Sequence, residues 1–155
     1  MFRVICCHND CQSERVGRIM GLKVIGSITI QNTHRLRCHC GAIELDIDLP
    51  DGVVDTRRCD CSLCRRRGAI VASMPEGLFR IVKGHEFLKR YQFGTHVAEH
   101  FFCDTCGIYT HHRRRSNPHL FGYNVGCLEG VNPFDLEDVP TMDGINHPSD
   151  RVDKI

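Results

Sequence analysis

The stretch Cys59-Asp60-Cys61-Ser62-Leu63-Cys64 is one of three tight cysteine groups, and these groups together decide the fold. The other two are Cys38-His39-Cys40-Gly41 and Cys103-Asp104-Thr105-Cys106-Gly107, so the three groups hold seven of the chain's 11 cysteines. Thiolates one or two residues apart can bind the same metal ion, and a glycine that follows them allows the backbone to turn tightly. The three groups therefore predict metal binding.

The number of cysteines in the groups predicts two different zinc sites. Two, three and two thiolates divide into a set of four and a set of three. A structural zinc site is closed by four protein ligands, whereas a catalytic site has three and leaves one position open. We therefore expect two zinc ions per chain, one structural and one catalytic. The alternative is two structural sites, the second completed by one of four nearby histidines, His39, His100, His111 or His112.

A disulfide framework is a further alternative, which the spacing disfavours. An odd group of three cysteines leaves a thiol over, and no secretory signal is recognisable in the sequence. Free thiolate ligands persist in a reducing compartment. We therefore expect a cytoplasmic protein whose clustered cysteines bind metal.

Composition excludes two classes of partner. The chain has 155 residues, enough for one domain with a modest core, and a formal net charge of +1. A chain with so balanced a charge does not have the strong excess of basic residues that is typical of nucleic-acid-binding proteins. No apolar run is long enough to span a membrane. We therefore expect neither nucleic acid nor membrane as a partner, and the sequence does not determine the oligomeric state.

Hydrophobic periodicity predicts an all-β fold. Apolar residues alternate with acidic residues over 43–49, the pattern of a strand with one buried face. A short apolar run over 68–74 ends at Pro75 and predicts a buried strand. No window has the pattern of a long amphipathic helix. Further strands are expected around Phe79 and Ile81, Phe87 to Phe93, Phe101 and Phe102, 108–110 and 121–127.

The first 33 residues differ from the rest of the chain. They contain Cys6, Cys7 and Cys11 without the spacing of a tight metal-binding turn, and Met20 offers a second plausible start of translation. We predict a poorly ordered extension over 1–33, a zinc-binding domain over 34–150 and a short tail over 151–155. The domain is expected to be a zinc-stabilised stack of short antiparallel sheets.

The ordered set of motifs Cys-x-Cys-Gly, Cys-x-Cys-Ser-x-Cys-Arg and Cys-x-x-Cys-Gly resembles that of the glutathione-dependent formaldehyde-activating family, which includes centromere protein V-like proteins. The resemblance runs from about Cys38 to Cys127 and on into 143–148. It implies the family's β-tent fold, a stack of antiparallel sheets that bind zinc. Members of the family usually begin shortly before the first Cys-x-Cys motif, so the N-terminal extension is a departure.

The resemblance also implies a role for each cysteine group. Cys38, Cys40, Cys103 and Cys106 match the family's structural zinc ligands. Cys59, Cys61 and Cys64 match its catalytic zinc ligands, in agreement with the division into four and three. Arg65 matches the basic residue that ends the middle motif, and we predict that it binds substrate.

The activity implied by the resemblance is that of a carbon–sulfur lyase resembling S-(hydroxymethyl)glutathione synthase. Its partners would be glutathione or another small thiol and formaldehyde or a related small aldehyde. Three thiolate ligands leave the metal site electron-rich, which favours thiol chemistry over hydrolysis by a metal-bound hydroxide. Two alternatives remain open at this point, a zinc-stabilised binding module with two structural metals and a thiol-redox or zinc sensor.

The remaining basic residues have a simpler interpretation. The arginines at 57–58 and 65–67 flank the middle group, and apart from Arg65 we expect them to form a solvated loop that offsets thiolate charge. Strand alternation would send His111 and His112 to opposite faces, so at most one of them points toward a metal site. Cys127 is expected to be a small core residue.

Overall fold

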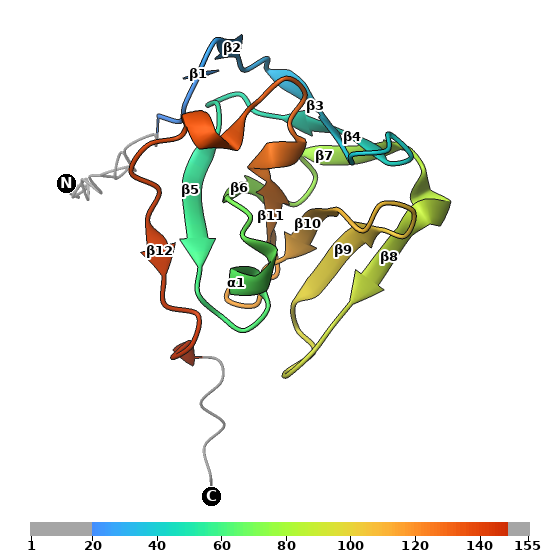
Figure 1. The fold of residues 1–155 in the computed structure, drawn as a ribbon, viewed down its shortest axis with the longest axis vertical. Helices are drawn as coiled ribbons and strands as arrows, with labels where there is room; N and C mark the ends of the chain where they lie inside the picture. The colour runs from blue at the N-terminus through green and yellow to red at the C-terminus, as the bar shows by residue number, and fades with distance from the viewer. Residues whose placement is uncertain (1–19, 149–155) are drawn as a thin grey trace, which may run out of the picture.

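Short strands in three sheets dominate the computed structural model, which describes residues 20–148 (Figure 1). One four-residue α-helix, α1 (Cys64–Arg67), and three 3₁₀ turns (His85–Phe87, Val125–Cys127 and Pro133–Asp135) complete the regular structure of these residues. The strands are β1 (Val24–Ile25), β2 (Ile28–Thr29), β3 (Thr33–Arg37), β4 (Glu44–Asp48), β5 (Val54–Cys59), β6 (Val71–Pro75), β7 (Phe79–Lys83), β8 (Leu88–Tyr91), β9 (Glu99–Cys103), β10 (Tyr109–Arg113), β11 (Leu120–Asn124) and β12 (Thr141–Met142).

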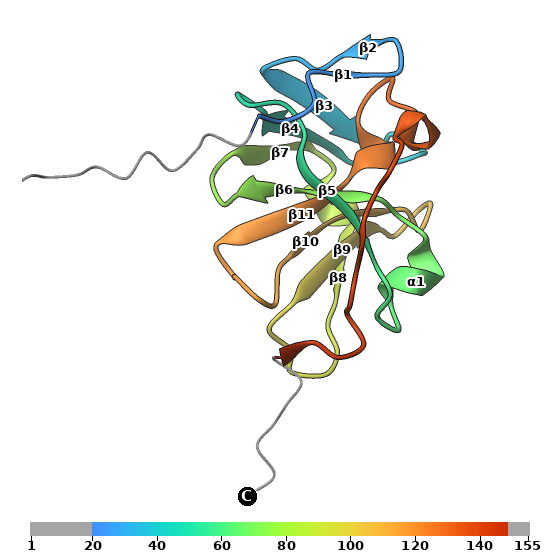
Figure 2. The same ribbon diagram turned by 90° about the vertical axis from the view of Figure 1, so that its left-hand side faces the viewer.

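The largest sheet has seven strands in the order β12-β5-β6-β11-β10-β9-β8. A three-stranded sheet has the order β3-β4-β7, and β1 pairs with β2. Neighbouring strands are antiparallel except β12, which pairs with β5 in parallel. In the rotated view the three-stranded sheet lies between the β1–β2 hairpin and the large sheet (Figure 2). The prediction of an all-β fold built from short antiparallel sheets is confirmed.

Alternation in the sequence explains how β4 packs. Leu45 and Ile47 have no exposed surface, whereas the acidic residues that alternate with them along β4 are half-buried on the other face. Leu36 of β3 pairs with Leu45 and is also fully buried. From the large sheet, Met74 and Tyr123 join the same apolar cluster. One core therefore holds the two larger sheets together, and its burial is the main apolar contribution to folding.

Residues 20–33 are part of the fold, in contrast to our expectation of an extension over 1–33. The Gly21 amide donates to the Asp51 carbonyl at 2.9 Å, and the Leu22 amide donates to the Val53 carbonyl at 2.8 Å. Ile25 and Ile30 are buried in the core. The strands β1 and β2 have two residues each, too few to show periodicity, so no strand was predicted there. Residues 1–19, with Cys6, Cys7 and Cys11, and the tail from 149 lie outside the described residues.

The strand predicted over 121–127 ends earlier than its alternating pattern does. β11 ends at Asn124, whose side-chain oxygen accepts a hydrogen bond from the Gly126 amide at 3.0 Å and begins a 3₁₀ turn. Val125 and Cys127 are buried from this turn instead of from a strand. Cys127 is 5% exposed within the core cluster, as expected of a small core residue. In the described part of the chain, no helix combines the length and the apolar character needed to span a membrane.

Candidate metal centres and the adjoining pocket

Cys38, Cys40, Cys103 and Cys106 come together from two sheets. Cys38 follows β3 of the small sheet, and Cys103 ends β9 of the large sheet. Their four sulfur atoms lie within 4.8 Å of one another, with 3.6 Å between Cys38 and Cys40 and 3.8 Å between Cys40 and Cys103. A tetrahedral zinc with Zn–S bonds of about 2.3 Å requires sulfur atoms about 3.8 Å apart. The donor set and its spacing therefore fit zinc.

Cys59, Cys61 and Cys64 form a second group at the C-terminal end of β5. Cys59 is the last residue of β5, and Cys64 is the first of α1. The three sulfur atoms lie within 4.8 Å of one another, and all three residues are half-buried. In the described chain no histidine or carboxylate joins this set of three. The structure thus brings together seven cysteines in sets of four and three, both able to hold a metal ion.

Hydrogen bonds connect the thiols of the second group. A hydrogen bond between Cys59 and Cys64 lowers the pKa of Cys59 to about 5 and raises the pKa of Cys64. The Cys64 amide also donates to the Cys61 sulfur at 3.4 Å. Deprotonation of one thiol is therefore favoured at neutral pH, the state that a metal ion binds.

All eight cysteines among residues 20–148 are free thiols, so no disulfide framework exists in that region. His39, one of the histidines considered as a metal ligand, is exposed on its turn. His100 and His112 lie instead on the large sheet, where their rings stack 5.4 Å apart.

The segment that follows β12 closes over the three-cysteine group. The Asp60 carboxylate accepts hydrogen bonds from the amides of Gly144 at 2.7 Å and Ile145 at 3.3 Å. A Cβ atom on residue 144 would lie 2.7 Å from the Cys61 Cβ and even closer to the Cys59 sulfur. Only glycine allows the backbone to approach the thiols this closely.

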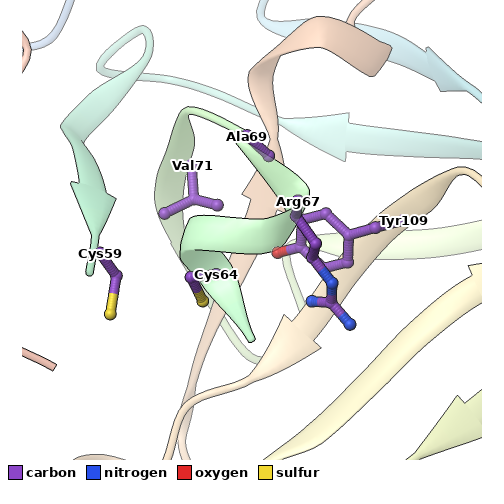
Figure 3. A pocket seen from close by; sticks show the side chains of 6 residues that line it. All are labelled: Cys59, Cys64, Arg67, Ala69, Val71 and Tyr109. Atoms are coloured by element: carbon purple, nitrogen blue, oxygen red, sulfur yellow. The ribbon is translucent and has the colours of Figure 1, made fainter. Parts of the chain in front are cut away.

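A small pocket adjoins the second group. It is lined by Cys59, Cys64, Arg67, Ala69, Val71 and Tyr109 (Figure 3). Ala69 and Val71 supply an apolar wall, and Tyr109 is buried at the start of β10.

The arginine at this pocket is Arg67, whereas Arg65, our predicted substrate-binding residue, is exposed on α1. Four residues of α1 turn Arg67 toward the large sheet, where its guanidinium lies 4.3 Å from the centre of the Tyr109 ring. A helix this short has no periodic sequence pattern, so the sequence did not reveal which of three consecutive arginines would face the pocket. The role of Arg65 in substrate binding stays a prediction.

A bulge in β10 places Tyr109 and His112 on the same side of the sheet. The pairing with β9 shifts between Tyr109 and His111, and the Tyr109 hydroxyl lies 2.5 Å from His112 Nδ1. Behind the pocket, Arg67 donates to His100 Nδ1 at 3.1 Å. Burial, followed by the positive charge of Arg67, lowers the pKa of His100 to about 4, and burial holds the pKa of His112 well below its usual value. Both imidazoles are therefore neutral acceptors near pH 7.

His111 points into the core on the other side of the sheet. It is 2% exposed and stacks on Phe101 with ring centres 4.6 Å apart. The two neighbouring histidines thus face opposite sides, as strand alternation predicted, and only His112 faces the side of the pocket. Tyr109 was not predicted to lie at the site because its orientation depends on the bulge in β10, which hydrophobic periodicity does not reveal.

Two known relatives of this chain, a protein family and a solved structure, resemble it over the region of the site. A family model described as glutathione-dependent formaldehyde-activating enzyme matches residues 33–140, a range that contains both cysteine sets. A Rhodobacter sphaeroides protein of known crystal structure is 58% identical. The alignment covers 70% of this chain and 99% of the other, with a TM-score of 0.67.

Proposed function

The chain belongs to the glutathione-dependent formaldehyde-activating family, and from this premise we propose that it is a zinc-dependent carbon–sulfur lyase that adds the glutathione thiol to formaldehyde or a related small aldehyde. The observation that carries the proposal is the set of three thiols at a pocket, with no fourth protein ligand among the described residues. A closed structural site would have such a ligand.

We assign the two cysteine sets different tasks. Cys38, Cys40, Cys103 and Cys106 would hold a structural zinc between the two sheets. Cys59, Cys61 and Cys64 would hold a zinc with one open position beside the pocket. When bound there, zinc lowers the pKa of a coordinated thiol, so that thiolate is present at neutral pH.

The reaction joins the substrate sulfur to the aldehyde carbon. The carbonyl π electrons move to oxygen, and the proton lost by the thiol ends on that oxygen. The product is a hemithioacetal, which for formaldehyde is the S-hydroxymethyl adduct. The apolar wall of Ala69 and Val71 would exclude water from the aldehyde. Asp60 fixes the turn between Cys59 and Cys61 through its hydrogen bonds to the segment after β12 and so holds the thiols in position.

The first test of this proposal is the zinc content of the protein purified under reducing conditions, followed by titration with glutathione. We expect two zinc ions per chain, one of which exchanges or changes its environment when glutathione binds. Two inert zinc ions that glutathione does not affect would instead favour the binding module with two structural metals. Loss of zinc on mild oxidation, reversed by a thiol reductant, would favour the sensor.

Substitution of Cys61 by serine tests the catalytic assignment. We expect Cys61→Ser to retain one zinc per chain and to lose at least 100-fold in the rate of adduct formation above the uncatalysed background, because its site would lack a thiolate ligand. Cys127→Ala is the matched control, since Cys127 is a buried free thiol that belongs to neither metal-binding set, and it should retain both zinc ions and the activity. Undiminished turnover by Cys61→Ser would contradict the proposal.

A further inference from the structure

The Arg67 guanidinium lies at the pocket, and its partners among residues 20–148 are neutral. It donates to His100 Nδ1 at 3.1 Å, and its face covers the Tyr109 ring. Within residues 20–148, no carboxylate forms an ion pair with it, although other arginines are paired, such as Arg57 with Asp55 at 2.6 Å. A half-buried cation held in this way can still bind an anion from solution.

The surroundings of the pocket strengthen its preference for an anion. Arg67 and Arg115 both act on His100 with positive charge, which opposes the negative charge of thiolates at Cys59 and Cys64. Because the site is partly shielded from solvent, such charges interact with a ligand more strongly than exposed ones do.

Arg67 also connects the pocket to a second depression. Arg67, Ala69 and Tyr109 line both hollows. The second hollow has a volume of about 230 Å³ and lies at the turn between β9 and β10. Its other lining residues are Phe102, Gly107, Ile108 and Asn124. A ligand whose sulfur reaches the three-cysteine group would therefore pass Arg67 on its way into this hollow.

We propose that Arg67 binds a carboxylate of the thiol substrate, so that the protein selects thiols that carry a carboxylate a few bonds from the sulfur. This inference rests on the proposed function, because it requires a thiol at the three-cysteine group. Guanidinium binds carboxylate through two parallel N–H···O bonds, and the fixed stack on Tyr109 reduces the entropy lost when they form. The substrate body would lie against Phe102 and Ile108 in the second hollow.

The competing role for Arg67 is compensation of thiolate charge at the metal site. The two roles differ in what a neutral substitution removes. If Arg67 compensates thiolates, its loss weakens zinc binding and affects all thiols equally. If Arg67 binds the substrate carboxylate, its loss affects only thiols that carry one.

The test compares two small thiols of the same length, one with a carboxylate and the other with a neutral amide in its place. Binding of 3-mercaptopropionate and of 3-mercaptopropionamide to the zinc-loaded full chain is measured by isothermal titration calorimetry, with zinc content determined before and after. We expect wild type to bind the carboxylate about 10-fold or more tightly than the amide. Arg67→Gln should bind both equally and keep its zinc. Arg66→Gln, a neighbouring exposed arginine on α1, should retain the wild-type selectivity.

Each other outcome overturns the assignment. Equal binding of the two thiols by wild type would be consistent with a thiol site at the three-cysteine group but would show that Arg67 does not bind the carboxylate. Selectivity that persists in Arg67→Gln and disappears in Arg65→Gln would assign the role to Arg65. Zinc loss from Arg67→Gln would show charge compensation. If neither thiol binds to wild type, the proposed function itself fails.

Discussion

At the scale of single residues, burial of His111 in the core makes the stability of the fold depend on pH. Burial lowers its pKa to about 3, whereas an unfolded histidine titrates near about 6.5. Between these two values the unfolded chain binds a proton that the folded chain does not bind. Stability must therefore fall as the pH falls below about 6.5.

We predict that replacing His111 by phenylalanine removes this component. Phenylalanine can continue the stack with Phe101, and it binds no proton in either state. Between pH 7 and pH 5 the free energy of unfolding of wild type should drop by about 2 kcal/mol more than that of His111→Phe. Chemical denaturation at several pH values, with zinc present throughout, measures the difference. Any release of metal at low pH destabilises both proteins equally, so its effect cancels in the difference between their free energies of unfolding.

His119→Gln serves as the control, because the side chain of His119 is 88% exposed. Its pH dependence should follow that of wild type. Parallel stability curves for wild type and His111→Phe would show that His111 does not lose its proton on folding.

At the scale of secondary-structure elements, a close contact depends on one glycine. Gly144 does not have a left-handed backbone, but the segment after β12 approaches the thiols so closely that a side chain has no space. We predict that Gly144→Ala displaces either this segment or Cys59 and Cys61. Zinc affinity at the three-cysteine site, measured by competition with a chelator, should fall at least 10-fold while the other site keeps its metal.

Gly126→Ala is the matched substitution. A Cβ atom there would lie 3.3 Å from the Asn124 side chain and 3.4 Å from Pro133, contacts that small shifts relieve. It should leave both zinc affinities unchanged. A normal second zinc site in Gly144→Ala would mean that the segment after β12 does not constrain the thiols.

The elements also show how far the sequence determines the fold. The alternation over 43–49 predicted β4, because one buried face imposes a period of two. The cysteine spacing predicted both sets of thiols, because turns bring nearby ligands together whatever the tertiary structure. The β10 bulge and the orientation of α1 depend instead on pairing with distant strands and packing against them, so Tyr109 and Arg67 were not identified from the sequence. The hairpin over 24–29 was missed for the same reason, since its stability comes from contacts with the core.

At the scale of the whole molecule, the two cysteine sets differ in what they join. The set of four connects the two larger sheets, and its Cys38 and Cys103 belong to the core cluster. The set of three lies between β5 and α1, which are adjacent in the chain. Metal at the first set therefore ties together segments that are distant in sequence, and its loss should affect folding far more than loss of the second.

Serine substitutions in the two sets test this difference. Cys40 is exposed, so Cys40→Ser removes a metal ligand without opening a cavity in the core. A structural zinc contributes about 10 kcal/mol or more to folding, which is comparable to the whole stability of a typical domain, about 5–15 kcal/mol. We expect Cys40→Ser to lose the cooperative thermal transition seen by circular dichroism, or to shift it downward by at least about 15 °C.

Cys61→Ser provides the internal comparison, because it removes a ligand of the same chemistry from a site within one local turn. Its melting temperature should stay within about 5 °C of wild type, since the core and both sheets keep their contacts. If Cys40→Ser lost its zinc and still unfolded at the wild-type temperature, the apolar core alone would hold the sheets together. If Cys61→Ser unfolded as readily as Cys40→Ser, both metals would be structural, and the case for an open catalytic site would weaken with it.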